Sequence, residues 1–516
     1  MEQEQQRTPF RINDIKDLVP EKLKPWILVL FVLIYQVSGG IYMAAVSEMS
    51  SALALMNEDV MMAGYASMVG LALTFTVMFR LKFRFTIRTS LIVTAVAMML
   101  CNLITMTTDS VPLLVAVSFV SGFFRMWGTF ACNTTIQLWI TPKRDMAEWF
   151  VFIYFLVQGA IQLSGLCTIY ASLLGTWEQM HWIMAGLLAI TAFVTIVLFR
   201  DHRPGKVVPL DDIDWTGAAL WAVTVLSLIF VLNYGNHYDW FDSERIWAGA
   251  LVFAVCLGVN LWRSTFIEQP FIALETWRFR NVWLTALLYP VVDTLLSPSH
   301  AFEHLYMASV LNYDALHAVS MNWFVWGGIV CGAGFSWVTF AKRRWRFKTM
   351  TFIGFALVMG YLISMYFLID YHQTKAVIGL ALFLRGAGFV MIAISFITSL
   401  TILPFPNFAQ ALTVQGFFSA CIGSLLGTTI LKELLLRCHR QNFVELSGHF
   451  NGFWADLRLL PVDVAYGTAQ RHALLESMKE IYGYLVILGL FCILAFFMRE
   501  SSLGPKRLIR KAAGKG

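Results

Sequence analysis

The sequence predicts an all-α polytopic membrane protein with about 14 transmembrane helices, arranged as two six-helix bundles with an inserted two-helix hairpin. Three observations support this fold class. The 516 residues are 58% hydrophobic and only 14% charged, whereas a soluble domain carries about a quarter charged residues. About fourteen apolar segments approach or exceed the roughly 20 residues that cross the hydrocarbon core of a bilayer. Lysine and arginine collect in every second gap between these segments.

The alternation of charge predicts the orientation of the helices. The gap at 80–88, the gap at 342–348 and the C-terminal tail are basic, and the intervening gaps hold mostly acids such as Glu58, Asp109 and Asp370. Basic loops stay in the cytoplasm because positive charge resists translocation. Both ends of the chain are therefore expected in the cytoplasm. The net charge of +6 is explained by these loops, so no nucleic-acid partner is expected.

We expect every apolar segment to be helical, because backbone groups in lipid must be satisfied within the segment. The predicted spans are approximately 26–48, 61–79, 89–107, 112–139, 147–174, 180–199, 215–234, 246–265, 282–306, 317–339, 349–369, 375–402, 408–432 and 480–498. The leader before the first span is polar, and no small-residue cleavage pattern follows that span. We therefore expect the first segment to remain as a membrane span rather than to be removed as a signal peptide.

Two halves of the chain resemble each other. The fourth span carries Arg125 about midway, the twelfth carries Arg385, and each arginine is followed by a glycine three residues later. Glu48 and Glu303 lie at similar depths at the ends of the first and ninth spans. If these halves are repeats, the two arginines are equivalent and so are the two glutamates. Repeats of this kind mark transporters, in which the binding site lies near the bilayer midplane between the bundles.

The repeats predict the domain organisation. The expected domains are a cytoplasmic leader (1–24), an N-terminal six-helix bundle (25–200), a linker with inserted helices 7 and 8 (201–270), a C-terminal six-helix bundle (271–500) that includes an outer segment (437–478), and a basic cytoplasmic tail (501–516). The outer segment is too apolar for a disordered linker, so we expect it to be partly helical and packed or partner-bound. The tail is expected to orient the last span and to touch anionic lipid.

Ionisable side chains inside the spans are the first candidates for function, because burying a charge in lipid is costly unless it is paired or hydrated. Arg125 and Arg385 stay charged, so each would tune the protonation of an acidic partner. Asp293 lies near the middle of the ninth span between Pro290 and Pro298, which should bend the helix and expose carbonyl groups. We expect Asp293 to be protonated reversibly. The alternatives are helix-packing ion pairs for the arginines and a structural hydrogen bond for Asp293.

Further candidates for proton coupling lie nearer the outer face. Glu48 and Glu303 could couple to protons or could be ordinary rim residues. His300, Glu303 and His304 spell the H-x-x-E-H pattern of a zinc peptidase family. No third ligand is evident in the sequence, so no metal site is predicted. The cluster is instead expected to titrate at the outer mouth, because histidine changes charge near neutral pH; the alternative is interface decoration.

Polar side chains within the spans would contact a substrate in an otherwise apolar cavity. These candidates are Gln36, Tyr42, Asn133, Gln158, Gln162 and Asn322. Abundant Met and Phe would make such a cavity adaptable, although these residues more often pack helices. No Walker loop, Rossmann glycine pattern or CxxC pair occurs. ATP-driven transport, a bound cofactor and a disulfide framework are therefore not expected.

Several local strings resemble the major facilitator superfamily, and specifically its fourteen-span drug:proton antiporter branch. The matching strings are Ile213-Asp214-Trp215-Thr216-Gly217, Leu226-Ser227-Leu228, Gly235, Asp239-Trp240-Phe241, Phe279-Arg280-Asn281, Asn312-Tyr313 and, for the fourth-span arginine motif, Phe123-Phe124-Arg125. Three strings depart from the family: Phe75 and Met78 stand where Gly and Asp are usual, Gly39-Gly40 replaces a first-span Asp, and residues 162–167 replace the fifth-span signature. The chain is identified as a divergent member.

The resemblance implies a proton-coupled secondary transporter in the bacterial inner membrane that exports amphipathic or toxic small molecules by alternating access. A proton from outside would neutralise Asp293 or a neighbouring acid and change its interaction with Arg125 or Arg385. The resemblance also implies a periplasmic adaptor protein and an outer-membrane channel as partners. The alternatives are a transporter of one lipid-like or siderophore-like metabolite, and a metal-dependent membrane enzyme.

Overall fold

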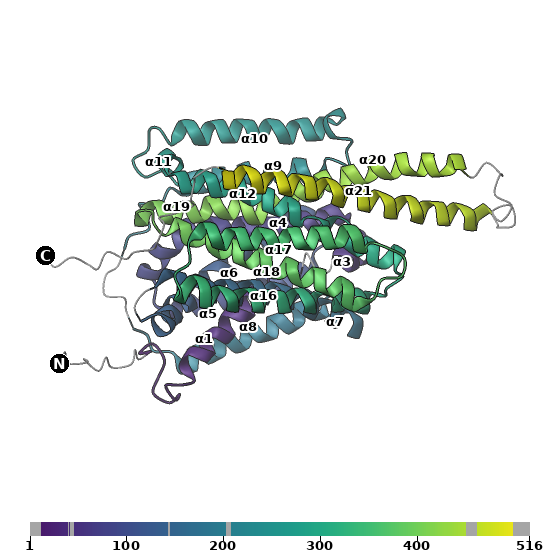
Figure 1. Ribbon diagram of the computed structural model, residues 1–516. Helices are drawn as coiled ribbons and strands as arrows, with labels where there is room; N and C mark the ends of the chain where they lie inside the picture. Colours follow the sequence, from purple (N-terminus) through teal and green to yellow (C-terminus); the bar gives the residue numbers. More distant parts are fainter. Residues whose placement is uncertain are drawn as a thin grey trace. The chain divides into compact units, whose positions relative to one another are not determined.

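A computed structural model describes residues 12–39, 41, 46–142, 145–202, 208–449 and 462–498. Within these residues the chain is helical, and the sole β contact is an isolated bridge between Ile15 and Phe199. Twelve of the described helices are long and apolar enough to cross a membrane. The prediction of an all-α polytopic membrane protein is confirmed (Figure 1).

The helices fall into two compact units. Unit 1 comprises Met1–Ala222, Asn260–Ala273 and Pro404–Thr413; unit 2 comprises Val223–Val259, Leu274–Leu403 and Val414–Gly516. Unit 1 contains α1 (Lys24–Val37), α3 (Val46–Leu53), α4 (Asn57–Arg84), α5 (Ile87–Thr107), α6 (Val111–Ile140), α7 (Met146–Leu174) and α8 (Gln179–Leu198). The predicted linker at 201–270 contributes residues to both units. Its role as a separate insertion stays a prediction.

Unit 2 contains the remaining helices. They are α11 (Leu274–Arg278), α12 (Arg280–Leu296), α13 (Pro298–Ala301), α14 (Glu303–Leu305), the π-helix η2 (Tyr306–Val310), α15 (Ala315–Ser320), α16 (Asn322–Ser336), the π-helix η3 (Trp337–Lys342), α17 (Phe347–Leu368), α18 (Lys375–Leu400), the π-helix η4 (Phe417–Gly423), α20 (Ser424–His449) and α21 (Val462–Met498). Three helices have residues in both units: α9 (Trp215–Tyr234), α10 (Glu244–Arg263) and α19 (Phe405–Gly416), and the short η1 (Trp240–Asp242) joins the first two.

One of the predicted spans, the ninth, is interrupted rather than continuous. It divides into α12, α13, α14 and η2, with Pro290 inside α12 and Pro298 opening α13. Proline cannot donate a backbone hydrogen bond, so these positions favour a break. Interrupted helices lie at membrane depth only where protein or a hydrated cavity covers them, which draws attention to this place. Within the predicted first span, α1 ends at Val37 and α3 begins at Val46, and residues 40 and 42–45 lie outside the described part.

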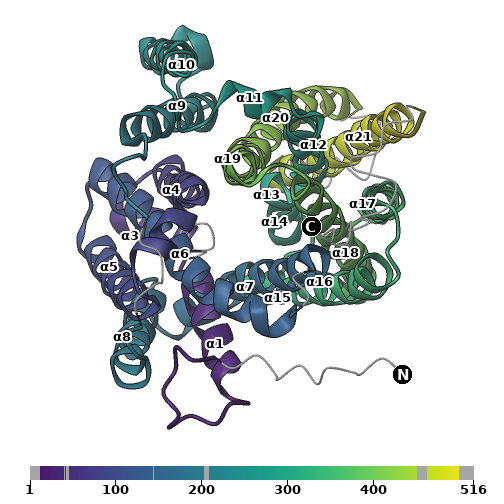
Figure 2. The same cartoon turned by 90° about the vertical axis from the view of Figure 1, so that its left-hand side faces the viewer.

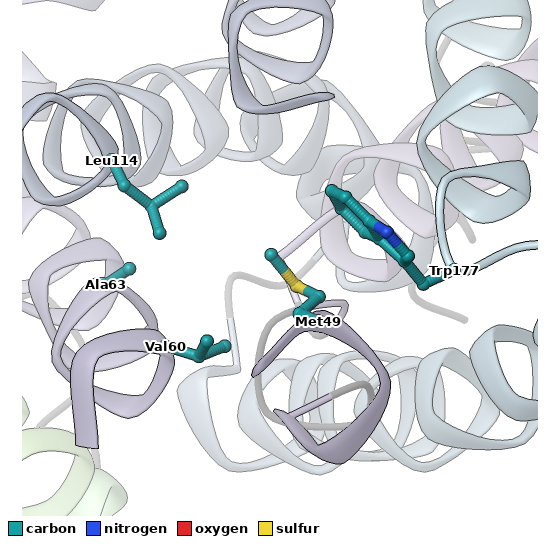
Figure 3. Close-up of a cluster of buried hydrophobic side chains, with 5 residues drawn as sticks. All are labelled: Met49, Val60, Ala63, Leu114 and Trp177. Carbon is teal, nitrogen blue, oxygen red and sulfur yellow. The ribbon is translucent and has the colours of Figure 1, made fainter. Parts of the chain in front are cut away.

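A small apolar cluster holds the second half of the first span in place. Met49 of α3 packs with Val60 and Ala63 of α4, Leu114 of α6 and Trp177, which precedes α8 (Figure 3). All five side chains are buried. Burying large apolar side chains stabilises a fold by roughly 1.5–3 kcal/mol each. The cluster therefore anchors α3 to unit 1.

Close helix packing in unit 1 depends on two glycines. A Cβ atom at Gly122 of α6 would lie 1.9 Å from the carbonyl oxygen of Ser67 in α4, and one at Gly70 of α4 would lie 2.1 Å from that of Phe119. Helices approach this closely in membranes when small residues line the contact. The backbones of α4 and α6 are therefore in direct contact beside Arg125.

Unit 2 repeats this arrangement between α16 and α18. A Cβ at Gly328 would lie 2.1 Å from the carbonyl oxygen of Phe383, and one at Gly386 would lie 2.3 Å from that of Val325. Matching these contacts to those of unit 1 pairs Phe119 with Phe383 and Gly122 with Gly386.

The register of the two glycine pairs corrects the sequence-based comparison of the halves. With Gly122 matched to Gly386, Arg125 corresponds to Phe389, and Arg385 corresponds to Ser121. The two arginines are therefore not equivalent, because they lie one helical turn apart. Sequence spacing misaligned them because the glycine after each arginine is not the glycine that packs against α4 or α16.

The outer segment is helical where it is described. α20 and α21 lie side by side, and Figure 1 shows the pair extending past the end of α17 in the same unit. Residues 437–449 and 462–478 belong to these two helices, as expected, and Asn442 donates to the Ser477 hydroxyl at 2.9 Å. Residues 450–461 lie outside the described part, as do 1–11 and 501–516 of the predicted leader and tail.

Asp214 explains why the Asp-Trp-Thr-Gly string begins the seventh span. Its carboxylate accepts from the backbone N–H of Gly217 at 2.9 Å, from the backbone N–H of Phe271 at 3.3 Å, and from the guanidinium of Arg263 at 2.5 Å. A Cβ at position 217 would lie 2.1 Å from this carboxylate, so glycine is required there. Burial alone would raise the pKa of Asp214, but the hydrogen bonds from Gly217, Thr216 and Arg263 outweigh it and hold the pKa below its ordinary value.

Replacing Asp214 with asparagine is expected to lower stability by about 1–2 kcal/mol near neutral pH, because the neutral amide can still accept from Gly217 but loses its charge-assisted hydrogen bond with Arg263. Because the folded-state pKa is depressed, the carboxylate stabilises the fold above the unfolded-state value of about 4, and this contribution disappears as pH falls through the folded-state pKa. Thermal unfolding of purified Asp214→Asn and wild-type protein between pH 8 and pH 3 measures this difference. Asp212→Asn is the matched control, because Asp212 is exposed and its only partner among the described residues, Arg80, lies 3.8 Å away.

Candidate functional site

A buried polar cluster in unit 2 surrounds Glu303. One carboxylate oxygen accepts from the guanidinium of Arg385 in α18, and the other accepts from the hydroxyl of Tyr361 in α17. The Tyr361 hydroxyl lies 3.4 Å from that of Tyr482 in α21, and the Arg385 guanidinium lies 5.6 Å from the centre of the Tyr361 ring. Figure 2 shows α17 beside both α18 and α21 within unit 2. Four helices thus contribute to one site.

The local breaks in the ninth span place Glu303 in this cluster. α13 ends at Ala301, Phe302 adopts a non-helical φ of −150°, and Glu303 begins α14. Phe302 packs edge-on against Tyr482 with ring centres 5.4 Å apart. The side chains of Glu303 and Arg385 are only 6% and 12% exposed. A buried ion pair of this kind is held by its additional hydrogen bonds, since each charge has lost its water.

The chemistry available at this cluster is a proton-controlled ion pair. A charged Glu303 binds Arg385 strongly, because hydrogen bonds between ionised partners are about twice as strong as neutral ones. A protonated Glu303 would lose the charge and leave Arg385 to seek another partner. The arrangement can therefore convert proton uptake into a change in how α14 is held to α17 and α18.

Asp293 is a second buried acid in unit 2. Its side chain is 9% exposed, and its Oδ2 atom has no hydrogen-bond partner among the described residues. The glycine at 423, at the end of the π-helix η4, packs directly on it, because a Cβ there would lie 2.4 Å from Oδ2. The Thr294 hydroxyl donates to the Pro290 carbonyl at 2.7 Å, so it does not bind Asp293. No described arginine lies within ion-pair distance of Asp293; within unit 2 the acid paired with Arg385 is Glu303.

Arg125 lies in unit 1, in the middle of α6, and is 3% exposed. Its Nη2 atom lies 3.4 Å from the sulfur of Met68, and its Nε atom has no hydrogen-bond partner among the described residues. No carboxylate in the described part of the chain lies within 4.0 Å of its guanidinium. The expected pairing of Arg125 with an acid is therefore not seen.

The predicted substrate-contacting residues divide between the units. Gln36 of α1 is buried and donates to the Thr129 hydroxyl of α6 at 2.9 Å. Asn133, eight residues beyond Arg125 on α6, is 4% exposed, and its Oδ1 atom has no described partner. Gln158 and Gln162 are half-buried, one turn apart on α7.

The other predicted site residues are half-buried, exposed or outside the described part of the chain. Asn322 is half-buried at the start of α16 in unit 2, and Tyr42 lies outside the described residues. Glu48 is half-buried in α3 and accepts from the Ser47 hydroxyl at 2.7 Å. His304 is exposed, whereas the adjacent Glu303 is buried.

The H-x-x-E-H pattern is divided by the break at Phe302. His300 belongs to α13 and His304 to α14, so the two are not successive turns of one helix. The Glu303 carboxylate is bound to Arg385 and Tyr361. No group of three His, Cys, Asp or Glu residues able to hold a metal ion occurs within the described part of the chain.

Sequence reasoning missed the two tyrosines and a buried histidine. Tyr361 and Tyr482 are fully buried within spans, where a hydroxyl group needs a partner, and this need was a usable signal. In unit 1, His181 is buried and its Nδ1 atom lies 2.9 Å from the amide oxygen of Asn102. The Asn102 amide donates to the Ser38 hydroxyl at 3.3 Å, at the end of α1. Polar groups therefore connect α8 to the C-terminal end of α1.

Comparison with known proteins gives distant relatives. No family model matches the chain. It is 25% identical over 289 residues to multidrug resistance protein 3 of Bacillus subtilis (strain 168), covering 52% of each chain. It is 26% identical over 157 residues to the multidrug export protein EmrB of Haemophilus influenzae, covering 29% of this chain and 30% of the relative. The chain thus spans about half the length of the first relative and under a third of the second.

Solved structures share the fold over almost the whole chain. The peptide transporter POT, in complex with alafosfalin, matches with a TM-score of 0.58 at 13% identity and covers 97% of this chain and 98% of its own. The proton:xylose symporter XylE of the major facilitator superfamily matches with a TM-score of 0.52 at 12% identity, covering 93% and 96%. None of these names describes an enzyme, so the metal-dependent enzyme gains no support. The chain shares its fold with transporters of the major facilitator superfamily, and its distant relatives are named for drug resistance and drug export.

Proposed function

We propose that the protein is a proton-coupled secondary transporter that exports amphipathic small molecules. The observation that carries the proposal is the buried Glu303–Arg385 pair with its two tyrosines, because transport coupled to protons needs an acid whose protonation changes a structural contact. The names of the two multidrug relatives support export as the direction. We place the protein in a bacterial inner membrane with both termini in the cytoplasm, as the charge alternation predicts.

The mechanism follows from the two states of Glu303. In the deprotonated state it holds α14 to Arg385 of α18 and Tyr361 of α17. In the protonated state its hold on Arg385 is lost, and the helices of unit 2 are released to rearrange. Asp293 is the second acid that we assign to the proton path, because it is buried without a described partner beside η4. A π-helix of this kind is common at functional sites.

The test is Glu303→Gln, which keeps the shape of the side chain but cannot ionise. In a pump-deficient bacterial strain expressing the protein, growth is scored against matched anionic, neutral and cationic amphiphiles. Inside-out vesicles from the same cells then report proton movement when a protective compound is added. We expect Glu303→Gln to reduce proton-driven flux at least about tenfold, while substrate exchange without a gradient persists.

The matched control is Glu48→Gln, which removes an acid that is half-buried and bonded to the adjacent Ser47. We expect it to retain proton-driven flux. Unchanged flux in both Glu303→Gln and Asp293→Asn, with normal expression, would remove the mechanism. Asp293→Asn alone is expected to lower flux without disturbing the pairing of Glu303 with Arg385, because the two acids share no described contact.

The second candidate is a transporter of one specific lipid-like or siderophore-like metabolite. The departures at residues 75, 78 and 162–167 from the drug-antiporter strings favour keeping it. Broad resistance in the growth panel supports the first candidate, and dependence on a single metabolite supports the second. A periplasmic adaptor protein is a further proposal, with the extended α20–α21 pair as its docking surface; loss of adaptor pull-down on shortening that pair, with the membrane spans intact, is the expected result.

A further inference from the structure

The starting observation is a buried positive charge for which the described chain offers no counter-ion. Arg125 is 3% exposed, its Nε atom has no described partner, and its Nη2 atom contacts the sulfur of Met68 at 3.4 Å. An unpaired charge away from water is unfavourable, so such a group is retained for a purpose.

The buried arginine of unit 2, Arg385, does have a counter-ion within the chain. There Arg385 is held by Glu303 and covers the ring of Tyr361. The glycine contacts match Arg125 with Phe389, an uncharged residue. Arg125 is therefore not the unit 1 copy of the paired arginine. Arg125 has no charged counterpart in unit 2 and lacks the acidic partner that Arg385 has.

The end of α1 brings backbone to this charge. A Cβ at Gly39 would lie 1.1 Å from the Nη1 atom of Arg125, so the guanidinium occupies the space that any other side chain would fill. Gly39 lies two residues after Val37, the last residue of α1. The guanidinium of Arg125 is thus directed at the C-terminal end of α1.

Further polar groups lie on the same face of α6. Arg125, Thr129 and Asn133 follow one another at intervals of four residues, which puts them on adjacent turns. The Thr129 hydroxyl accepts a hydrogen bond from Gln36. Asn133 is only 4% exposed, and its amide oxygen has no described hydrogen-bond partner. A second buried polar group without a partner, two turns from the first, is independent evidence for a missing ligand.

We propose that Arg125 binds the anionic head group of the transported solute, and that the protein therefore carries amphipathic organic anions. The proposal rests on the transport function proposed above and names its substrate class. A guanidinium binds carboxylate, sulfonate or phosphate through paired hydrogen bonds. The apolar part of the solute would lie along neighbours such as Met68, and the amide of Asn133 would bind a polar atom further along the same molecule. The solute supplies the negative charge that the chain omits.

The experiment measures equilibrium binding to the full-length protein in lipid nanodiscs, with no proton gradient. The probes share one phenylbutyl body and differ in head group: 4-phenylbutyrate, 4-phenylbutane sulfonate, 4-phenylbutyl phosphate, the neutral 4-phenylbutyramide and the cationic 4-phenylbutylamine. A charge-assisted hydrogen bond contributes about 1.5–3 kcal/mol, which corresponds to a preference of roughly tenfold to a hundredfold. We expect at least one anion to bind that much more tightly than the amide, and the amine to bind most weakly.

Three variants assign the preference to Arg125. Arg125→Gln is expected to reduce the ratio of anion to amide affinity to about one. Arg125→Lys is expected to retain part of the preference, because the positive charge remains but the paired donors of the planar guanidinium are lost. Arg437→Gln is the matched control, since Arg437 is exposed on α20 and paired with Glu433; it should leave the ratio unchanged. If Arg125→Gln cannot be recovered as monodisperse protein, the proposal is tested by the ratio of anion to amide affinity in the wild-type protein and by its reduction in Arg125→Lys.

Two results would overturn the proposal. One is wild-type protein that binds none of the three anions more tightly than the amide. The other is an Arg125→Gln protein that keeps the wild-type preference. Neither depends on proton coupling: Glu303→Gln should bind anions with the normal preference even where it no longer transports. Loss of flux in that variant with intact anion binding supports both proposals. Intact flux without any anion preference contradicts the anion proposal but leaves transport itself standing.

Discussion

Arg385→Met is expected to destabilise the protein by about 3–5 kcal/mol, the usual effect of removing one partner from a buried ion pair. The change leaves the Glu303 carboxylate buried, with the Tyr361 hydroxyl as its remaining described donor. The shape of the side chain is largely conserved, so little of the loss comes from packing. Thermal unfolding of detergent-purified protein, followed by a helix signal, measures the effect.

Two further variants test whether this loss comes from an orphaned charge. The double variant Glu303→Gln/Arg385→Met is expected to recover most of the stability, because removing both charges of a buried pair is often neutral. Arg125→Met is expected to cause no loss and to raise the unfolding temperature, since that arginine has no described counter-ion. An Arg385→Met protein as stable as Arg125→Met would show that the Glu303–Arg385 contact does not hold unit 2 together.

Gly122→Ala is expected to reduce the yield of folded protein strongly and to lower its stability by several kcal/mol. The new methyl group would lie 1.9 Å from the Ser67 carbonyl oxygen, which is backbone and cannot move aside as a side chain could. α4 and α6 would have to separate, and forcing atoms into a close-packed contact usually costs about 1–3 kcal/mol even when side chains can adjust. Unfolding temperature and size-exclusion profile after expression report the change.

Gly165→Ala in α7 is the matched control, because nothing lies within 4 Å of a Cβ at that position. There the same substitution is expected to raise stability slightly, by about 0.5–1 kcal/mol, since alanine favours helix more than glycine does. The sign of the effect therefore separates a packing glycine from a free one. Equal effects at positions 122 and 165 would contradict the close contact of α4 and α6.

Much of the helix pattern could be predicted because it depends on local chemistry. An apolar segment in lipid must satisfy its backbone hydrogen bonds internally, so it forms a helix whatever its neighbours are. Twelve such helices are found within the described residues. The prolines at 290 and 298 pointed to the broken ninth span for the same local reason.

The candidate site was predicted in part. Glu303 and Arg385, two of the ionisable residues predicted within spans, meet in the structure, and their role in proton coupling stays a prediction. The expected partner of Arg385 was Asp293 or a neighbouring acid, and the register between helices decides which. Tyr361 and Tyr482 come from helices far apart in the chain, so no spacing along the sequence could reveal that they share one carboxylate.

The sequence by itself determined that the chain is a helical membrane protein, where most spans begin and end, and which few charges lie within them, because lipid imposes the same requirement on each segment separately. Only the tertiary structure decided which charges are paired. Pairing depends on which turns of two helices face each other, and Gly122 and Gly386 set that register through backbone contacts. The result is one arginine bound to a glutamate and one arginine whose partner the described chain does not supply.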